Sequence, residues 1–147
     1  MSEQINTSMN IETPIFKKFK QYLVNKSQFS PYVFNDTPKN LAVFPTVIFK
    51  ESNNIQNLKA TTLDRTETVN DITDIIEIYT KDMVLDNKTY SKKEITNELK
   101  YLIFDFFQSW GFTRTQCTEA EYLNYEVDRY IIIETCSLNS WNRKINL

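Results

Sequence analysis

The chain has 147 residues, a formal net charge of −2 and a 41% share of hydrophobic residues. This predicts one domain with its own core, and the small net charge argues against a basic field that attracts nucleic acid. With no histidine and one glycine, the sequence excludes histidine-based active sites and glycine-rich phosphate loops. No apolar leader or stretch of about 20 apolar residues occurs, which predicts a soluble protein in a reducing cytoplasm without membrane contact. A structural protein without cofactor is therefore favoured over an enzyme.

The first quarter of the chain predicts an arm, a helix and a loop. Residues 1–11 are polar and without pattern, which indicates an N-terminal arm. Thr13 and Pro14 form a helix start, because a hydroxyl caps the first turn and proline suits the first helical position. Apolar residues at helical spacing predict a helix to about Asn25. The prolines that follow indicate a loop over residues 27–40.

Two strands are predicted next. Residues 41–50 form a nearly continuous apolar run, typical of a strand buried on both faces, and Pro45 indicates an edge strand or a bulge. A polar turn is expected over residues 52–59, and residues 71–81 alternate as a strand. Its faces are predicted to hold Ile72, Asp74, Ile76 and Ile78 on one side and Ile75, Glu77 and Tyr79 on the other.

The best-specified element is a helix over residues 91–110. Ser91 and Glu94 match a capping box, in which each side chain accepts from a backbone N–H of the first turn. Gly111 can adopt the left-handed conformation that ends a helix. The helix has one unbroken apolar stripe, which consists of Ile95, Leu99, Leu102, Ile103, Phe106, Phe107 and Trp110.

Two more strands, over residues 113–119 and 127–137, complete the pattern, and the polar gap between them indicates a hairpin. The order α-β-β-α-β-β predicts an α+β fold: a mostly antiparallel sheet with the long helix packed across it and a second, N-terminal helix. We expect a single domain over residues 12–137, with residues 138–147 as a polar C-terminal tail.

An acidic run covers the second strand and its approach. A Mg²⁺ or Ca²⁺ site would need several carboxylate oxygens to converge. Asp71 and Asp74 point to opposite faces of an extended strand and cannot converge alone. A solvated or interface surface is therefore the favoured interpretation, and a metal site is the alternative. The run consists of Asp64, Glu67, Asp71, Asp74 and Glu77.

Two further patterns have an ordinary interpretation beside a functional one. Residues 16–22 mix lysines with aromatic residues, which occurs in single-stranded nucleic-acid sites and, more commonly, in an amphipathic core helix. Cys117 and Cys136 have no histidine to act as a base, so we interpret them as packing residues. A disulfide between them is the alternative, which a reducing compartment disfavours.

Two of the few arginines stand at positions that suit an interface. Arg114 follows the expected helix end, and Arg129 lies in the last strand. Arginine is enriched at protein interfaces and pairs well with carboxylates, so both could bridge two subunits. The equally favoured alternative is an ion pair within the chain, such as Arg129 with Glu119 or Glu121.

Four stretches carry a family resemblance through their order and spacing: Phe44–Glu51, the acidic strand Thr68–Lys81, the helix end Trp110–Thr115, and Asp128–Tyr130. They resemble the tail-terminator (tail-completion) proteins of long-tailed phages, the type represented by the terminator of phage lambda tails. Together they span most of the chain, from residue 41 to residue 137.

The resemblance implies a structural virion protein. Such a protein forms a ring, expected to be hexameric, that caps the head-proximal end of the tail tube, stops tube polymerisation and docks the head connector. Implied partners are further copies of the chain, the tail tube protein, the head connector or neck protein and, in a contractile tail, the sheath. DNA would pass through the lumen without specific binding, which an acidic wall would favour, and assembly would occur in the host cytoplasm. The expected subunit or tube interface comprises Asp64, Glu67, Asp71, Asp74, Arg114, Arg129, Tyr130 and Trp141.

Three alternatives stay open at this point. One is another ring of the neck or head–tail connector. The second is a small metal-dependent nuclease that uses the acidic run, and it alone predicts divalent-metal binding and DNA cleavage. The third is a host-acting binding protein that works as a monomer, whereas the ring proteins predict a closed or tube-dependent oligomer.

Overall fold

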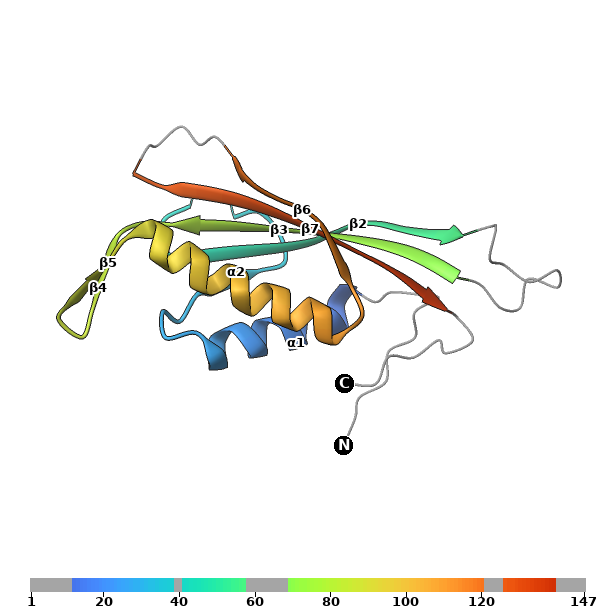
Figure 1. Cartoon of the computed structure of the whole chain (residues 1–147), viewed down its shortest axis with the longest axis horizontal. Helices are drawn as coiled ribbons and strands as arrows, with labels where there is room; N and C mark the ends of the chain where they lie inside the picture. The colour runs from blue at the N-terminus through green and yellow to red at the C-terminus, as the bar shows by residue number, and fades with distance from the viewer. Residues whose placement is uncertain (1–11, 39–40, 58–68, 121–125, 140–147) are drawn as a thin grey trace.

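The fold is α+β, with two helices on one face of a five-stranded sheet (Figure 1). The computed structural model describes residues 12–38, 41–57, 69–120 and 126–139. Its elements in chain order are α1 (Glu12–Lys26), β1 (Tyr32–Phe34), β2 (Thr46–Asn57), β3 (Val69–Thr80), β4 (Met83–Leu85), β5 (Lys88–Tyr90), α2 (Lys92–Ser109), β6 (Thr113–Ala120) and β7 (Asp128–Asn139). The sheet order is β1-β2-β3-β7-β6, and β4 and β5 form a separate hairpin.

The α+β class is confirmed, but the predicted order α-β-β-α-β-β is only partly right. The structure contains three further strands, β1, β4 and β5. They were not predicted because a strand of three residues is too short to show a period in the sequence. β1 pairs in parallel with β2, Tyr32 beside Thr46, so the sheet is mixed. The four long strands β2, β3, β7 and β6 are antiparallel neighbours, as expected.

β2 differs most from the sequence-based prediction. It begins at Thr46 and continues to Asn57, across the segment predicted as a polar turn. Backbone pairing with β3 needs no apolar side chains, so the ladder continues through polar sequence. The bulge that Pro45 indicated lies instead between Glu51 and Asn53. β1 pairs with residues 46–48 on the outer side of β2, so β2 is not an edge strand over these residues.

The helix ends show one wrong prediction and two that are confirmed. α1 begins at Glu12, two residues before Pro14, the predicted first helical residue. In α2 the Glu94 N–H donates to Ser91 Oγ at 3.2 Å, as the N-cap prediction requires. Gly111 has φ +82°, and its N–H and that of Phe112 each donate at 3.0 Å to carbonyls of the last helical turn.

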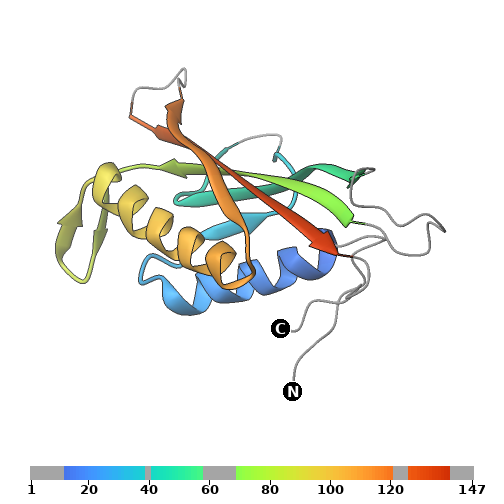
Figure 2. The same cartoon turned by 45° about the vertical axis from the view of Figure 1, so that its right-hand side comes forward.

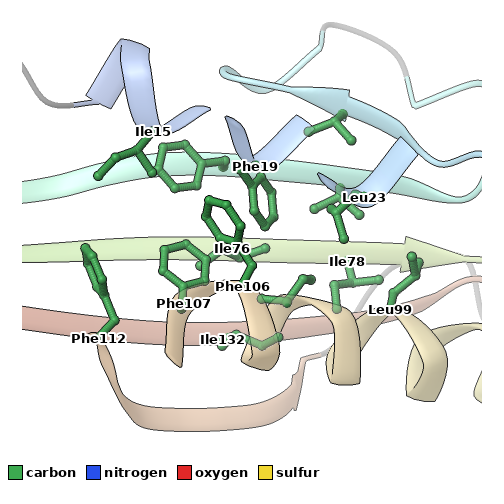
Figure 3. Close-up of a cluster of buried hydrophobic side chains, with 14 of the residues drawn as sticks. Ile15, Phe19, Leu23, Ile76, Ile78, Leu99, Phe106, Phe107, Phe112 and Ile132 are labelled. Carbon is green, nitrogen blue, oxygen red and sulfur yellow. The ribbon is translucent and has the colours of Figure 1, made fainter. Parts of the chain in front are cut away.

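The main core lies between the two helices and the sheet (Figure 2). α1 contributes Ile15, Phe19 and Leu23, which are at most 1% exposed. The Phe19 ring centroid lies 5.4 Å from that of Phe49 on β2 and 5.6 Å from that of Phe107 on α2. Figure 3 shows Phe19 of α1 and Phe107 of α2 lying together between the helices and the sheet. One aromatic network therefore joins both helices to the sheet.

β3 and β7 form the centre of the sheet and pair along their whole length. The predicted alternation in β3 is confirmed, because Ile72 and Ile76 are fully buried beneath the helices while Ile75, on the other face, is half-buried. β7 runs to Asn139, so the first two residues of the expected tail belong to the strand. The expected N-terminal arm and the rest of the tail lie outside the described residues.

The opposite face of the sheet carries no helix in the part of the chain that the structure describes (Figure 1). At one end Leu41 and Phe44 pack against a small second cluster, Ile48, Tyr79 and Val127. The burial on both faces that was predicted for residues 41–50 is thereby confirmed for residues 46–49, whereas Val43 is exposed. The remainder, called the open face below, has half-buried side chains: Lys50, Thr73, Ile75, Glu77, Arg129, Ile131, Ile133 and Thr135.

Candidate functional site

The predicted acidic surface is divided between the two faces of the sheet. Asp71 is exposed, whereas Asp74 is 1% exposed on the helix-covered face. The two carboxylates point to opposite faces, as expected. The interpretation of Asp74 as a solvated residue is wrong, because alternation places it on the same buried face as Ile72. Asp64 and Glu67 lie outside the described residues.

The metal alternative finds no support within the described ranges. They contain no group of three or more Asp, Glu, Cys or His side chains that could hold a metal ion. Convergent oxygens are what Mg²⁺ and Ca²⁺ require, and a strand spreads its carboxylates over two faces.

A row of charged side chains, which the sequence did not predict, crosses the sheet at one level. Direct pairing places Asp74 of β3 between Glu51 of β2 and Glu134 of β7. Glu134 in turn lies opposite Arg114 of β6. Directly opposed residues share a face, so the whole row lies on the helix-covered face. This charged row (Glu51, Asp74, Glu134 and Arg114) begins with an acid at one side of the sheet and ends with a base at the other.

Glu134 is a buried ionisable group of the charged row, and its pKa is raised. It is 2% exposed, and burial raises the pKa of Glu134 to about 7, while the charge of Arg114 opposes the rise. The signal in the sequence was its spacing of two from Ile132 within the last strand, which places the carboxylate on the buried face.

Arg114 stands at the exposed edge of the sheet with its side chain held in place. Its guanidinium carbon lies 4.3 Å from the ring centroid of Phe104 on α2, a cation–π contact. A surface hollow of about 430 Å³ opens beside it, lined by Phe104, Gln108, Phe112, Thr113, Arg114 and Glu134. The guanidinium is therefore oriented and still accessible.

Arg129 forms its ion pair within the chain, but with an unexpected partner. Its Nη2 donates to Oε1 of Glu77 on the open face, and this hydrogen bond raises the pKa of the Arg129 guanidinium. Glu119 lies opposite Tyr130, on the other face, and cannot be the partner. Tyr130 lies beneath the helices, where Lys100 Nζ is 4.5 Å from its ring centroid. The interface roles of these residues stay predictions.

The lysine-rich segment 16–22 is part of α1. Phe19 is fully buried and Lys17 and Lys20 are exposed, which confirms the amphipathic core helix. A hollow of about 330 Å³ lies between the two helices, lined by Lys18, Gln21, Tyr22, Asn25, Lys26, Phe106, Ser109 and Trp110. Nucleic-acid binding at this basic and aromatic surface stays the less favoured alternative.

The two thiols act in packing. Cys117 and Cys136 are free and half-buried against the core, so the packing interpretation is confirmed and the disulfide alternative is wrong. Burial raises the pKa of Cys136 to about 11, and nearby Asp74 adds to the rise. Glu121 and Trp141 lie outside the described residues.

The sheet ends in two unlike edges. β6 forms one edge along its whole length, with mostly exposed side chains. On the other side β1 pairs only with residues 46–48, so among the described residues no strand adjoins the β2 edge, residues 49–57. Bulges occur at the same level on both sides, after Glu51 and after Arg114. Free N–H and C=O groups on such edges can pair with another strand.

No protein-family model and no curated protein sequence matches this chain. The family resemblance rests on the four stretches Phe44–Glu51, Thr68–Lys81, Trp110–Thr115 and Asp128–Tyr130. None of the described helices is long and apolar enough to cross a membrane.

Proposed function

We propose that this chain is a structural virion protein of the tail-terminator type. It forms a ring on the head-proximal end of a phage tail tube, stops tube polymerisation and offers a docking surface to the head connector. Six copies complete the ring, and DNA passes through its lumen without specific contacts.

One structural observation supports this proposal above the others: the sheet has two unlike edges and two unlike faces. A closed cyclic ring repeats one heterologous interface, so each copy must present two different complementary surfaces. A protein with β6 at one end of its sheet and the β2 edge at the other meets this requirement. The resemblance of four stretches to tail terminators selects this ring from other neck rings.

The first test is the solution mass of the purified protein by light scattering, with negative-stain images of the same peak. We expect a closed ring of about six copies, since that is the size the resemblance implies. If the protein is monomeric, a tube-capping assay decides: tail tubes polymerised with the protein should stop at a defined length. A monomer that leaves tube length unchanged would overturn the proposal.

Within the ring, we propose that the exposed carboxylate of Asp71 faces the lumen or the tube. Asp74 no longer belongs to this surface, because it is buried. The variant Asp71→Lys should reduce infectivity while the protein still folds, because a cation there would hold DNA or repel the tube. Asp105→Lys, at an exposed position of α2, is the matched control. Equal infectivity of both variants would contradict this placement.

A further inference from the structure

We infer that copies of this chain associate edge to edge, with β6 of one copy paired antiparallel to the β2 edge of the next. In this pairing Arg114 of one copy lies opposite Glu51 of its neighbour. The inference rests on the proposed ring and names the interface that closes it.

The strand directions permit a continuous sheet. β2, β3, β7 and β6 are successive antiparallel neighbours, so β6 runs opposite to β2. A second copy placed beside β6 in the same orientation therefore presents its β2 edge antiparallel to β6. Backbone groups that point outward from the two edges can then pair with each other, as in strand addition.

The register fixes which residues meet. Ala120 is level with Thr46 across the sheet, where β1 already adjoins β2. The opposite half of β6 is level with the β2 edge. If neighbouring copies are not shifted along the strand direction, residues 113–117 of one copy therefore lie opposite residues 49–53 of the next. Within that overlap Arg114 meets Glu51, because the charged row connects them at one level.

Charge complementarity favours this arrangement. Within one copy the charged row contains three carboxylates and one guanidinium, with the guanidinium at the β6 side. Joining two copies gives Arg114 a carboxylate on each side, Glu134 from its own chain and Glu51 from the next. Arginine can serve two acceptors because it has five N–H donors. Its stacking on Phe104 already holds the side chain at the edge.

The decisive experiment is a charge exchange between copies. Arg114→Glu creates an acid–acid contact in every interface of a pure sample, and Glu51→Arg creates a base–base contact. Each variant alone should need a roughly tenfold or higher concentration to assemble, the loss expected for one charge-assisted contact. An equimolar mixture should restore assembly, because each copy then meets its complement. The restored ring should alternate the two variants and therefore contain equal numbers of each. Native mass spectrometry measures this composition.

The outcomes separate this interface from the ring itself. Wild-type rings, impaired single variants and a restored alternating mixture support the inference. If the wild type forms rings and the single variants assemble equally well, the inferred interface is overturned, while the proposal of a ring still stands. A dimer that Glu51→Arg does not weaken also overturns it, in favour of two-fold pairing between β6 strands. Wild-type protein that neither assembles nor caps tubes overturns the ring and this interface together.

Cross-linking keeps the test valid if a charge variant folds poorly. Gln116 and Lys50 share one level on the open face, three strand spacings apart, or about 14 Å, too far for a bridge within one copy. Gln116→Cys with Lys50→Cys, with both native thiols changed to alanine, should oxidise into covalent multimers up to the ring number. Gln116→Cys with Tyr101→Cys, on the exposed side of α2, is the control that should not. Equal cross-linking of both pairs would contradict the register.

Discussion

The two faces of the sheet differ in what covers them and therefore in what they contribute. On the helix-covered face, Phe19, Phe49 and Phe107 are fully buried and join both helices to the sheet. On the open face, Ile75 and Ile133 remain half-buried. Apolar burial stabilises by about 25 cal/mol per Å². Most of the apolar burial that stabilises the fold therefore lies on the covered face, while the open face and the edges keep accessible surface, which we propose serves assembly.

The largest expected effect comes from removing an aromatic ring on the covered face. Phe107→Ala should lower the free energy of unfolding by about 3–5 kcal/mol, because it leaves a cavity beside Phe19 and Phe49. Ile133→Ala on the open face should cost about 1 kcal/mol, since that side chain is only half-buried. Urea unfolding of both variants measures the difference. Equal losses would show that the faces contribute alike.

The buried carboxylate of Glu134 should give the covered face a pH dependence. Its pKa is about 7 in the folded protein and about 4.3 in the unfolded chain. A carboxyl whose pKa is higher when folded favours the fold below the unfolded pKa and loses that contribution as pH rises through the folded pKa. Between about pH 4 and 8 the wild type should therefore lose up to about 3 kcal/mol relative to Glu134→Gln, at 1.36 kcal/mol per pKa unit.

Urea unfolding at several pH values measures this loss. Glu119→Gln, at an exposed position of β6, provides the matched control and should show no comparable trend. A difference between wild type and Glu134→Gln that stays constant with pH would contradict the proposed burial of an ionisable carboxyl on this face.

The end of the helix that covers the core should show an intermediate effect. Gly111 has φ +82°, and a Cβ added there would meet no atom within 4 Å, so the cost of a side chain is conformational. Gly111→Ala should destabilise by about 1–2 kcal/mol, and Gly111→Asn by less, because asparagine tolerates the left-handed region. Thermal unfolding compares the two variants, and an alanine variant as stable as wild type would refute the strain.

The smallest effect is expected from the ion pair of the open face. The side chains of Arg129 and Glu77 remain 29% and 13% exposed, so solvent screens their attraction. Arg129→Met should change the free energy of unfolding by about 0–1 kcal/mol, and added salt should reduce that change. A larger coupling free energy in a double-mutant cycle with Glu77→Gln, unchanged by salt, would contradict this expectation and show that the pair contributes substantially to stability.

Local features were predictable because their signals lie within a few residues. The caps of α2 at Ser91 and Gly111 depend on neighbouring backbone groups, and the alternation in β3 follows from a period of two. The polar half of β2 was mispredicted because its pairing to β3 is a backbone interaction that side-chain polarity does not reveal. The start of α1 was also mispredicted, at Pro14 instead of Glu12, a shift of two residues.

The candidate interface was only partly predictable. Arg114 was recognised from its position after the helix end, but the carboxylates that share its level in the sheet, Glu134 on the next strand and Glu51 at the far edge, were not. These carboxylates belong to strands far apart in sequence, and no pattern in one segment reports on another. The acidic run was predicted as a charged surface. The burial of Asp74 was missed because it depends on the helices that pack over that face of the sheet.

The sequence by itself determined the α+β class, the long capped helix, the alternating central strand and the lack of histidine chemistry. Only the tertiary structure decided the mixed sheet, the charged row and the partner of Arg129, which lies 52 residues away at Glu77. The physical reason is that caps and periodicity are local, whereas cross-strand contacts depend on register. Register is set by the packing of the whole sheet against its helices.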